Sequence, residues 1–499
     1  MIPFVKSSTS SNKKIYVGKI VHDGENFATV ISMLNAKLKG ENVLNLTVKQ
    51  TRDIGAKYSI SIKEEGINIT ASTEGAYPAF STLIKLVRED ENGTYFLESA
   101  IFDQARFSYR SAMLDDARYF HGKENVKKFL DVLFNLKFSV FHWHLSDDQG
   151  FRLRLDGIED VCEKASKRKN SRVGGYVFGH ADGKEHQGIY TKEDVEEIKQ
   201  YAKERGIKVI PEIDLPGHFS AILSAKPEFS CDGKQMDVPY QTGVLENVLC
   251  LGNQKAREFA KDLLLKTAKL FDTDVMHVGF DEIKTNKLKK CPKCQERIKA
   301  LGLKDEKALI ENFRVEVRDF LKENGVNIIC WNDGLTEVDR DCVVQHWKFG
   351  TDKETVKRIN DGQKMIISDF YHYYMDYPYS MTPLKKTYYH EPVFLGVEKK
   401  ENIIGIEAPF WAEWAKEWDK IKFNGYYRLA CVAETAWNEE KRPYEVFMED
   451  LRKNEEEYFG ERLDISEKLL NPKFKRLKFI RYVFSDNQIE LKKWQKSKK

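Results

Sequence analysis

Short apolar runs that alternate with amphipathic stretches fill residues 106–440 and restrict the fold more than any other feature of this sequence. Eight of these runs have the length of buried strands. They are Ser108–Leu114, Ser139–Leu145, Lys208–Ile213, Val275–Phe280, Asn327–Trp331, Val343–Trp347, Met365–Phe370 and Ile403–Ala408. Several gaps between them have helical apolar spacing, at Lys123–Leu136, Lys192–Arg205, Asn253–Phe271, Glu306–Glu323 and Thr355–Asp361. Eight strand-then-helix units predict an α/β fold, a (β/α)8 TIM barrel.

The segments on either side of the predicted barrel have other patterns. Period-2 alternation at Asn45–Lys49 and Tyr58–Lys63 predicts half-buried strands. We therefore expect a small α+β domain over residues 1–105, followed by the barrel over residues 106–440. Residues 441–499 are charged and helical in pattern, which predicts a C-terminal helical extension packed on the barrel.

Polar and aromatic residues follow the predicted strands at the end where barrel enzymes build their active sites. They include Asp115, His142, His144, Asp147, Asp148, Glu212, Asp214, His218, Asp281, Glu282, Asp333, Gln345, Tyr374, Asp376 and Glu413. One such strand ending could arise by chance. Eight at one rim are hard to explain by packing, because buried carboxylates need partners.

Asp281 and Glu282 follow the fourth predicted strand and form the richest of these endings. Neighbours on a strand point to opposite faces, so both can reach one ligand only where the strand has become a loop. Two carboxylates at one site repel, so one tends to keep its proton, as a general acid with a pKa of roughly 6–7 requires. A helix start with Asp281 as N-cap is the structural alternative for the pair, but its place after a strand favours catalysis.

Trp331, Trp347 and Trp411 follow three of the predicted strands. Sugar rings have apolar faces that lie against indoles, and their hydroxyls need charged or polar partners. Such partners are available at Arg110, Asp376 and Glu413. Core packing is the alternative for any single tryptophan, but three at strand ends favour a carbohydrate site.

His142 and His144 allow a different interpretation. Residues i and i+2 share one face of a strand, so the pair could hold a metal, as in metal-dependent amidohydrolases. Against this, Asp147, Asp148 and His218 are better explained as a hydrogen-bonded carboxylate–imidazole relay. Packing and hydrogen bonding near the barrel interior is the favoured interpretation of the two histidines.

Cys291-Pro-Lys-Cys294 is a single CxxC motif. A structural zinc site needs four ligands, and no second pair of cysteines has matching spacing. Zinc, a redox pair or disulfide, and plain packing all stay open, with packing favoured. The eight cysteines are scattered along a long chain, which is typical of reduced thiols rather than of a disulfide scaffold.

Composition argues against two classes of function. Lys and Arg total 81 against 78 Asp and Glu, a formal net charge of +3 that disfavours a general nucleic-acid binder. No stretch approaches the ~18 apolar residues of a membrane helix. The N-terminus has no apolar core of a secretory signal. We expect no nucleic-acid partner, no membrane span and a cytoplasmic location, unless a signal has been removed from a secreted protein.

The ordered motifs resemble the glycoside hydrolases of family 20, the β-N-acetylhexosaminidases. The matching segments are Tyr109-Arg-Ser-Ala-Met-Leu-Asp115, His142-Trp-His-Leu-Ser-Asp-Asp-Gln-Gly-Phe-Arg152, Val209-Ile-Pro-Glu-Ile-Asp-Leu-Pro-Gly-His218, His277-Val-Gly-Phe-Asp-Glu282, Trp331-Asn-Asp333, Gln345-His-Trp347, Tyr374-Met-Asp376, Trp411-Ala-Glu413 and Ala433-Glu-Thr-Ala-Trp437. The N-terminal segment also looks like the non-catalytic domain that precedes the barrel in that family. Phe280 departs from the family's usual Gly-Gly-Asp-Glu, and we expect this bulky residue to reshape the pocket wall.

The resemblance implies substrate-assisted retaining hydrolysis of terminal β-linked GlcNAc or GalNAc, with no metal or organic cofactor. The acetamido oxygen of the sugar is then the nucleophile, at high effective concentration. Glu282 is implied as general acid and base, and Asp281 as the group that accepts the acetamido N–H and stabilises an oxazolinium-like intermediate. The implied substrate-binding and supporting residues are Arg110, Asp147, His218, Trp331, Trp347, Tyr374, Asp376, Trp411 and Glu413.

Other functions stay open beside this one. A disaccharide-releasing enzyme of the lacto-N-biosidase type would use the same chemistry. Two further alternatives would not use this chemistry. They are a metal-dependent amidohydrolase built on His142 and His144, and a non-catalytic carbohydrate-binding barrel. The expected partners are β-N-acetylhexosaminide oligosaccharides or glycoconjugates, and a homodimer is one assembly that the sequence allows. The GlcNAc or GalNAc preference, the aglycone and the linkage are not predicted.

Overall fold

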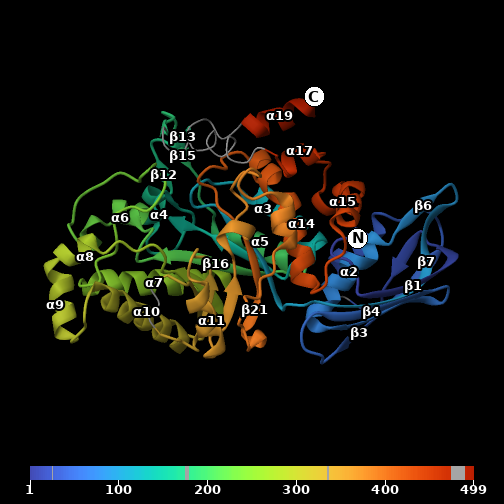
Figure 1. Cartoon of the computed structure of the whole chain (residues 1–499), viewed down its shortest axis with the longest axis horizontal. Helices are drawn as coiled ribbons and strands as arrows, with labels where there is room; N and C mark the ends of the chain where they lie inside the picture. Colours follow the sequence, from blue (N-terminus) through green and yellow to red (C-terminus); the bar gives the residue numbers. More distant parts are fainter. Residues whose placement is uncertain (25, 175–178, 334–336, 474–488, 499) are drawn as a thin grey trace.

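A computed structural model describes residues 1–24, 26–174, 179–333, 337–473 and 489–498 of the chain. The chain forms a closed barrel, an N-terminal sheet beside it and a group of C-terminal helices (Figure 1). Among these described residues, no helix combines the length and the apolar character that a bilayer crossing requires.

The N-terminal domain is a seven-stranded mixed sheet in the order β1-β7-β4-β5-β3-β2, with β6 paired to β7. Its strands are β1 (Ser7–Tyr16), β2 (Lys19–Val21), β3 (Val43–Thr51), β4 (Lys57–Lys63), β5 (Gly66–Ser72), β6 (Arg88–Asp90) and β7 (Gly93–Gln104). Its helices are α1 (Ala28–Asn35), η1 (Thr73–Gly75) and α2 (Ala76–Lys85). Helix α2 contacts both the sheet and the barrel helix α3, and so eight of its ten residues are buried. The predicted α+β domain is confirmed.

Eight parallel strands close the barrel in the order β16-β17-β18-β19-β20-β21-β8-β9. They are β8 (Tyr109–Asp115), β9 (Val140–His144), β16 (Lys208–Leu215), β17 (Val275–Gly279), β18 (Asn327–Trp331), β19 (Cys342–His346), β20 (Met365–Ile367) and β21 (Ile403–Phe410). The predicted TIM barrel is confirmed, since each predicted strand is present. Four strands, β9, β17, β19 and β20, end one to three residues earlier than predicted. At β17 the reason is the left-handed backbone of Phe280 (φ 70°), and at β20 it is the start of helix α12 at Phe370.

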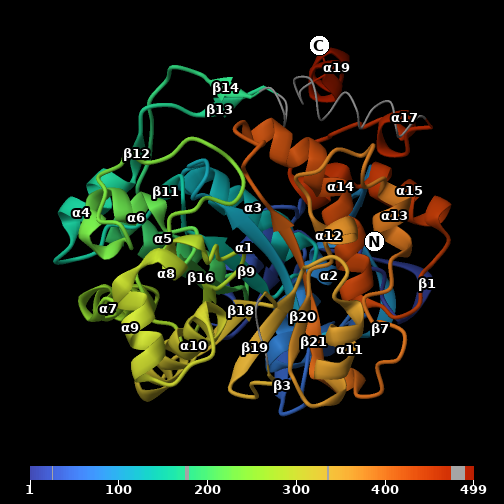
Figure 2. The same ribbon diagram turned by 60° about the vertical axis from the view of Figure 1, so that its left-hand side comes forward.

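Helices follow most of the strands and surround the barrel (Figure 2). The predicted ones are α3 (Lys123–Asn135), α5 (Lys192–Lys203), α7 (Gln254–Phe271), α10 (Glu306–Glu323) and α11 (Asp352–Asn360). Local sequence sets their starts: Thr191 and Asp194 form a capping box at α5, and Asp305 caps α10. The aromatic-rich gap after β20 contains only α12 (Phe370–Tyr373), α13 (Leu384–Tyr389) and η3 (Lys400–Asn402).

Shorter elements lie in the barrel loops, and further helices follow the barrel. The loop elements are β10 (Ser146–Asp147), β11 (Gly150–Phe151), α4 (Glu159–Ala165), β12 (Lys167–Arg168), β13 (Arg172–Val173), β14 (His180–Ala181), β15 (His186–Gln187), α6 (Ser220–Ala225), η2 (Pro227–Phe229), α8 (Asn286–Lys290) and α9 (Pro292–Ala300). After β21 come α14 (Trp418–Trp437), α15 (Tyr444–Lys453), α16 (Glu455–Phe459), α17 (Glu467–Leu470) and α19 (Ile489–Ser497). The domain boundaries near residues 105 and 440 stay predictions.

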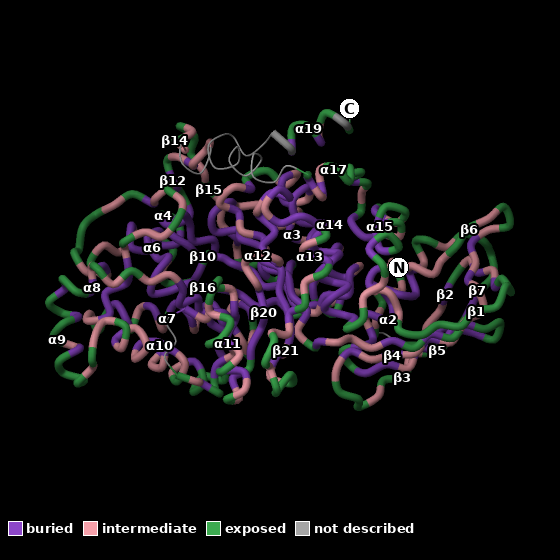
Figure 3. Tube along the Cα trace, viewed as in Figure 1, coloured by how far each residue is buried: buried purple, intermediate pink, exposed green. Residues whose placement is uncertain are grey.

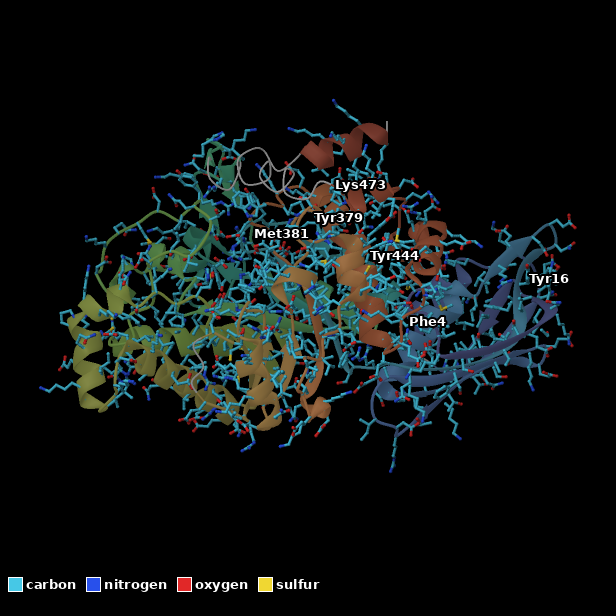
Figure 4. The ribbon with its side chains drawn as sticks, viewed as in Figure 1. Phe4, Tyr16, Tyr379, Met381, Tyr444 and Lys473 are labelled. Atoms are coloured by element: carbon cyan, nitrogen blue, oxygen red, sulfur yellow. The ribbon has the colours of Figure 1, made fainter. Side chains whose placement is uncertain are left out.

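A buried charge pair joins the N-terminal domain to the barrel. Lys137 Nζ lies 2.9 Å from Asp103 Oδ2, and both side chains are fully buried. Tyr58 donates its hydroxyl to the same carboxylate at 2.7 Å, and the Trp437 indole donates at 2.9 Å. These bonds satisfy the buried charges of the junction. Figure 4 places Phe4 where the N-terminal domain meets the C-terminal helices.

The barrel interior has an apolar layer beneath a polar one. Val140, Ile210, Ile329 and Ile366 form a separate buried apolar cluster near the start of the strands. Later on the same and neighbouring strands lie buried polar side chains, namely His142, Glu212, His277, Gln345 and Glu407. Burial is continuous through the barrel (Figure 3). The polar layer therefore supports the C-terminal rim, where the predicted site residues lie.

Candidate active site

Asp281 and Glu282 lie in a tight loop directly after β17. Gly279, Phe280 and Glu282 have φ values of 68°, 70° and 50°, so the strand has given way to left-handed backbone. A Cβ atom on Gly279 would lie 1.7 Å from Asp214 Oδ1, so only glycine fits there. The turn brings both carboxylates to one imidazole: His218 Nε2 is 3.5 Å from Glu282 Oε2 and 3.7 Å from Asp281 Oδ2.

A series of ion pairs connects His218, the neighbour of Glu282, to other buried charged residues. His218 Nδ1 lies 3.1 Å from Asp147 Oδ1 and 3.3 Å from Asp148 Oδ2. Asp147 also binds the Arg118 guanidinium at 2.8 Å and His144 Nε2 at 2.9 Å. Burial opposes the charge on His218, but the carboxylates around it outweigh burial and raise its pKa well above the usual value. His218 is therefore an imidazolium that faces Glu282.

The two adjacent carboxyls differ in acidity. Burial raises the pKa of Asp281 to about 6, although the charge of His218 opposes this shift. Burial would also raise the pKa of Glu282, but the hydrogen bond and charge of His218 outweigh it and lower that pKa. In the free protein the carboxyl with the raised pKa is therefore Asp281, whereas the pKa of the implied general acid Glu282 is lowered. Glu282 is the more exposed of the two, with 36% side-chain exposure against 11% for Asp281.

Four aromatic side chains form a wall beside the carboxylates. The rings of Trp347 and Tyr374 are nearly parallel, with centroids 6.2 Å apart. Trp411 lies 6.1 Å from Tyr374 and 5.8 Å from Trp331. The Trp331 indole donates to Glu212 at 2.9 Å, which fixes its orientation. The structure thus brings together all three tryptophans that follow predicted strands.

Polar groups without protein partners face the same region. Asp376 Oδ1 and the Trp347 indole nitrogen are buried, and neither has a hydrogen-bond partner among the described residues. Burial raises the pKa of Asp376 to about 7. Glu413 accepts the Gly243 N–H at 3.1 Å and lies 3.8 Å from Arg118. Buried polar atoms left unpaired are costly, so a polar ligand is the natural partner for them.

Arg110 lies at the opposite end of the barrel, and its assignment to substrate binding is corrected. Its guanidinium donates to the carbonyls of Lys137, Phe107 and Ser108 at 2.8–3.0 Å, and it packs over Trp437. It lines a cavity of about 470 Å³ beneath the barrel. Arg110 lies away from the site because it is near the start of β8, whereas the active-site rim is formed by the C-terminal ends of the strands.

Arg118 occupies the place expected for Arg110. It follows β8 directly, binds Asp115 at 3.2 Å as well as Asp147, and lies 4.9 Å from the centre of the Trp411 ring. Its position three residues after Asp115, beyond the strand end, was the signal that could have identified it. Asp214 and Asp333 were noted at the predicted strand ends, but neither of them was assigned a role in the site.

Asp214 and Asp333 hold the loop that carries Asp281 and Glu282. Burial and the neighbouring Asp281 raise the pKa of Asp214 well above its usual value. Asp333 accepts the Glu282 N–H at 3.0 Å. A hollow of about 350 Å³ opens beside Glu282 and Asp333. Phe280 borders this hollow, and its ring centroid lies 6.0 Å from that of Phe313.

His142 and His144 bind carboxylates on both ring nitrogens. His142 lies 2.9 Å from Glu407 and 3.2 Å from Glu212, while His144 contacts Glu212 and Asp147. Despite burial, these carboxylates raise the pKa of His142 to about 9 and that of His144 to about 10. These contacts are the hydrogen bonding near the barrel interior that the sequence favours for the two histidines.

The family model described as "Glycosyl hydrolase family 20, catalytic domain" matches residues 107–440. A β-hexosaminidase of Porphyromonas gingivalis is 28% identical over 88% of this chain and 60% of its own length. A β-hexosaminidase of Akkermansia muciniphila is 32% identical over 68% of this chain and 70% of its own. The crystal structure of a Flavobacterium johnsoniae chitobiase superposes with a TM-score of 0.78 at 25% identity, covering 96% of this chain and 74% of that one.

This chain therefore spans less than two thirds of the Porphyromonas relative. The match to the family model nevertheless covers the entire barrel from β8 to α14, including both carboxylates after β17. On this match and this fold, the chain belongs to glycosyl hydrolase family 20.

Proposed function

We propose that the protein is an exo-β-N-acetylhexosaminidase that releases a terminal β-linked N-acetylhexosamine by substrate-assisted retaining hydrolysis. One observation carries this proposal: Asp281 and Glu282 both face His218 beside a wall of tryptophans at the C-terminal rim. Two acidic groups with different pKa values can divide two roles between them. The family membership and the β-hexosaminidase relatives support the same activity.

In the proposed reaction, the acetamido oxygen attacks the anomeric carbon from within the substrate. Asp281 accepts the acetamido N–H and stabilises the positive charge that develops on the ring of the oxazolinium-like intermediate. Glu282 protonates the departing oxygen and then takes a proton from the attacking water. Bound sugar would exclude water from Glu282, and this added desolvation raises the pKa of Glu282 toward that of a neutral acid.

The remaining residues hold the sugar. Trp331, Trp347 and Trp411 wall the ring and its N-acetyl group, and Tyr374 donates to the acetamido oxygen. Three charged groups at the rim, Arg118, Asp376 and Glu413, bind ring hydroxyls. Asp147 and His218 act behind Glu282, and no metal takes part in this chemistry. The substrate class is that of terminal β-N-acetylhexosaminides.

Arg118→Lys is expected to lower kcat/KM by roughly 10–100-fold, because losing one charge-assisted hydrogen bond costs about 1.5–3 kcal/mol. Lysine keeps the charge but not the planar fork that reaches Asp115, Asp147 and a sugar hydroxyl together. Arg110→Lys is the matched control, since Arg110 lies beneath the barrel, and it should lower the melting temperature rather than kcat/KM. Equal kcat/KM losses in both variants would remove Arg118 from the site.

The pH profile of kcat/KM should have an acid limb near pH 6. Asp281, with its pKa of about 6, must be ionised to accept the acetamido N–H, so activity falls as the pH drops through that value. His218 stays cationic throughout, because its pKa is far higher. Asp281→Asn should abolish this limb, whereas Asp376→Asn, which removes a group that titrates near 7, should keep it. A wild-type profile that is flat between pH 7 and pH 5 would contradict the assignment.

Hydrolysis of a β-linked N-acetylglucosamine tetramer tests the proposal directly. The expected product is the monosaccharide, released one unit at a time from the non-reducing end. Release of disaccharides instead would identify a disaccharide-releasing enzyme of the same chemistry. Binding without any hydrolysis would identify a non-catalytic carbohydrate-binding barrel.

A further inference from the structure

Four cysteines from distant parts of the sequence meet at one point outside the candidate active site. They are Cys231, Cys250, Cys291 and Cys294, and their sulfur atoms all lie within 4.8 Å of one another. The Cys291–Cys294 motif lacks a second pair at matching sequence spacing, but the fold supplies one. Cys231 and Cys250 come from the long loop after β16, whereas the CxxC motif begins α9.

The distances between the sulfur atoms fit a tetrahedral metal site. Three of the six distances are 3.6 Å for Cys250–Cys291, 3.8 Å for Cys250–Cys294 and 3.9 Å for Cys231–Cys294, and all six are within 4.8 Å. Four thiolates around zinc, with Zn–S bonds of about 2.3 Å, form a tetrahedron with edges of about 3.8 Å. All four cysteines are free thiols in this structure. We propose that these four thiolates bind a structural zinc ion.

The CxxC half of the site has the local structure that thiolate ligands need. Cys291 is the N-cap of α9 and Cys294 lies in its first turn, where the helix dipole favours negative charge. Gly252 donates its backbone N–H to Cys294 Sγ at 3.3 Å. A Cβ atom on Gly252 would lie 2.3 Å from the Cys294 nitrogen, so glycine alone allows this approach. Such outer hydrogen bonds orient and stabilise metal ligands.

The other two ligands stand at the base of a loop. An isolated bridge pairs Ser230 with Leu249, and Cys250 donates its N–H to Phe229 O at 2.8 Å, so the loop ends are already held together. Cys231 is half-buried and the other three cysteines are buried. Four thiolate ligands leave no open coordination position, which is the arrangement of structural rather than catalytic zinc.

Nearby charge suits a zinc tetrathiolate, which carries a net charge of about −2. Three exposed lysines lie within or next to the CxxC motif, at Lys289, Lys290 and Lys293. The loop itself is fixed to α8 by further polar contacts, since Lys287 Nζ lies 2.9 Å from Asp232 and 2.6 Å from Asn247. These contacts hold the cysteines of the two segments at the same place.

The zinc would fix a loop that reaches the active-site rim. Beyond the cysteines, Gly243 donates to the Glu413 carboxylate at 3.1 Å, and Gln149 donates to the Gln241 carbonyl at 2.6 Å. Closing the base of a long loop removes much of its conformational freedom. This consequence for sugar binding rests on the proposed function, whereas the metal content of the protein does not.

Metal analysis of the full chain tests the site. After growth with zinc and exhaustive exchange into metal-free buffer, the wild type should contain one zinc ion per chain by mass spectrometry. Replacement by cobalt should give the intense visible bands and sulfur-to-metal charge-transfer absorption of tetrahedral cobalt thiolate. Cys294→Ser and Cys250→Ser should each lower the zinc content at least about tenfold. Cys162→Ser, which removes a buried thiol of α4 outside the cluster, should retain it.

Two results would overturn the proposal. One is a wild type that neither contains zinc nor develops a cobalt–thiolate spectrum; this result needs no variant to fold. The other is an unchanged zinc content in Cys294→Ser. A disulfide in the cluster would appear as fewer than eight reactive thiols after denaturation without reductant, and it would also refute the site. Zinc bound in a protein that hydrolyses no hexosaminide would uphold the metal site and refute only the proposed function.

Discussion

Glu282→Gln is expected to lower kcat/KM for substrates with sugar or alkyl leaving groups by about 10²–10⁴-fold, the usual contribution of a positioned general acid. Glutamine keeps the size of the side chain and its contact with His218 but cannot donate the proton. A nitrophenyl leaving group departs without protonation, so the loss with an aryl glycoside should be much smaller. The measurement is kcat/KM for both substrate types in the same variant.

Glu258→Gln provides the control for this variant. Glu258 is exposed on α7, where it accepts a hydrogen bond only from Gln254 among the bonds that the structure records for it, and its replacement should leave both rates unchanged. If Glu282→Gln lost the same factor with both leaving groups, Glu282 could not be the acid. The proposal would then need another proton donor within reach of the glycosidic oxygen.

Asp281→Asn is expected to lower kcat by about 10²–10³-fold, as removal of one electrostatic contact to a developing charge does. Asparagine offers no negative charge to the oxazolinium-like intermediate, and its amide can turn a donor toward the acetamido N–H. Asp281 acts on the acetamido group rather than on the leaving oxygen. An activated aryl leaving group should therefore not rescue this variant, in contrast to Glu282→Gln.

The opposite dependence of the two variants on the leaving group separates their roles. Rescue of Asp281→Asn by a nitrophenyl leaving group would indicate that Asp281 assists protonation of the leaving oxygen. Unchanged turnover in Asp281→Asn would remove it from the mechanism. Circular dichroism of both variants checks the fold, because the loop from Gly279 to Glu282 carries left-handed backbone.

The barrel could be predicted because its signal is local. A parallel strand buried on both faces is a short apolar run, and each such run fixes its own element. The ends of strands are less well defined: β20 stops at Ile367 because Asp369 caps a new helix, and β17 stops at Gly279 where the backbone turns left-handed. Side-chain capping and close backbone approach determine where these strands end, and the apolar periodicity of the sequence predicts neither of them.

Site residues could be predicted where their position along a strand determines which end of the barrel they face. Residues after strand ends meet at one rim, and the structure brings Asp281, Glu282, Trp331 and Trp411 together there. Arg110 was assigned from a motif despite its place at the start of a strand, and it lies at the other end of the barrel. The acidity of the two carboxyls could not be predicted, since it depends on His218 and Asp214.

The cysteine cluster shows what sequence spacing leaves out. Cys291 and Cys294 have the short spacing that a motif search detects. Cys231 and Cys250 have no recognisable spacing to each other or to the motif, because a loop and the helix α7 separate them along the chain. Only the closure of the loop base at Ser230 and Leu249 brings them to α9.

The most direct test of the account compares two substrates that differ only at C2. The account predicts that kcat/KM for nitrophenyl N-acetyl-β-glucosaminide exceeds that for nitrophenyl β-glucoside by at least about 10³-fold, because an intramolecular nucleophile acts at an effective molarity of about 10⁵–10⁸ M. Comparable kcat/KM values for the two glycosides would show that the acetamido group is not the nucleophile, and would contradict the account.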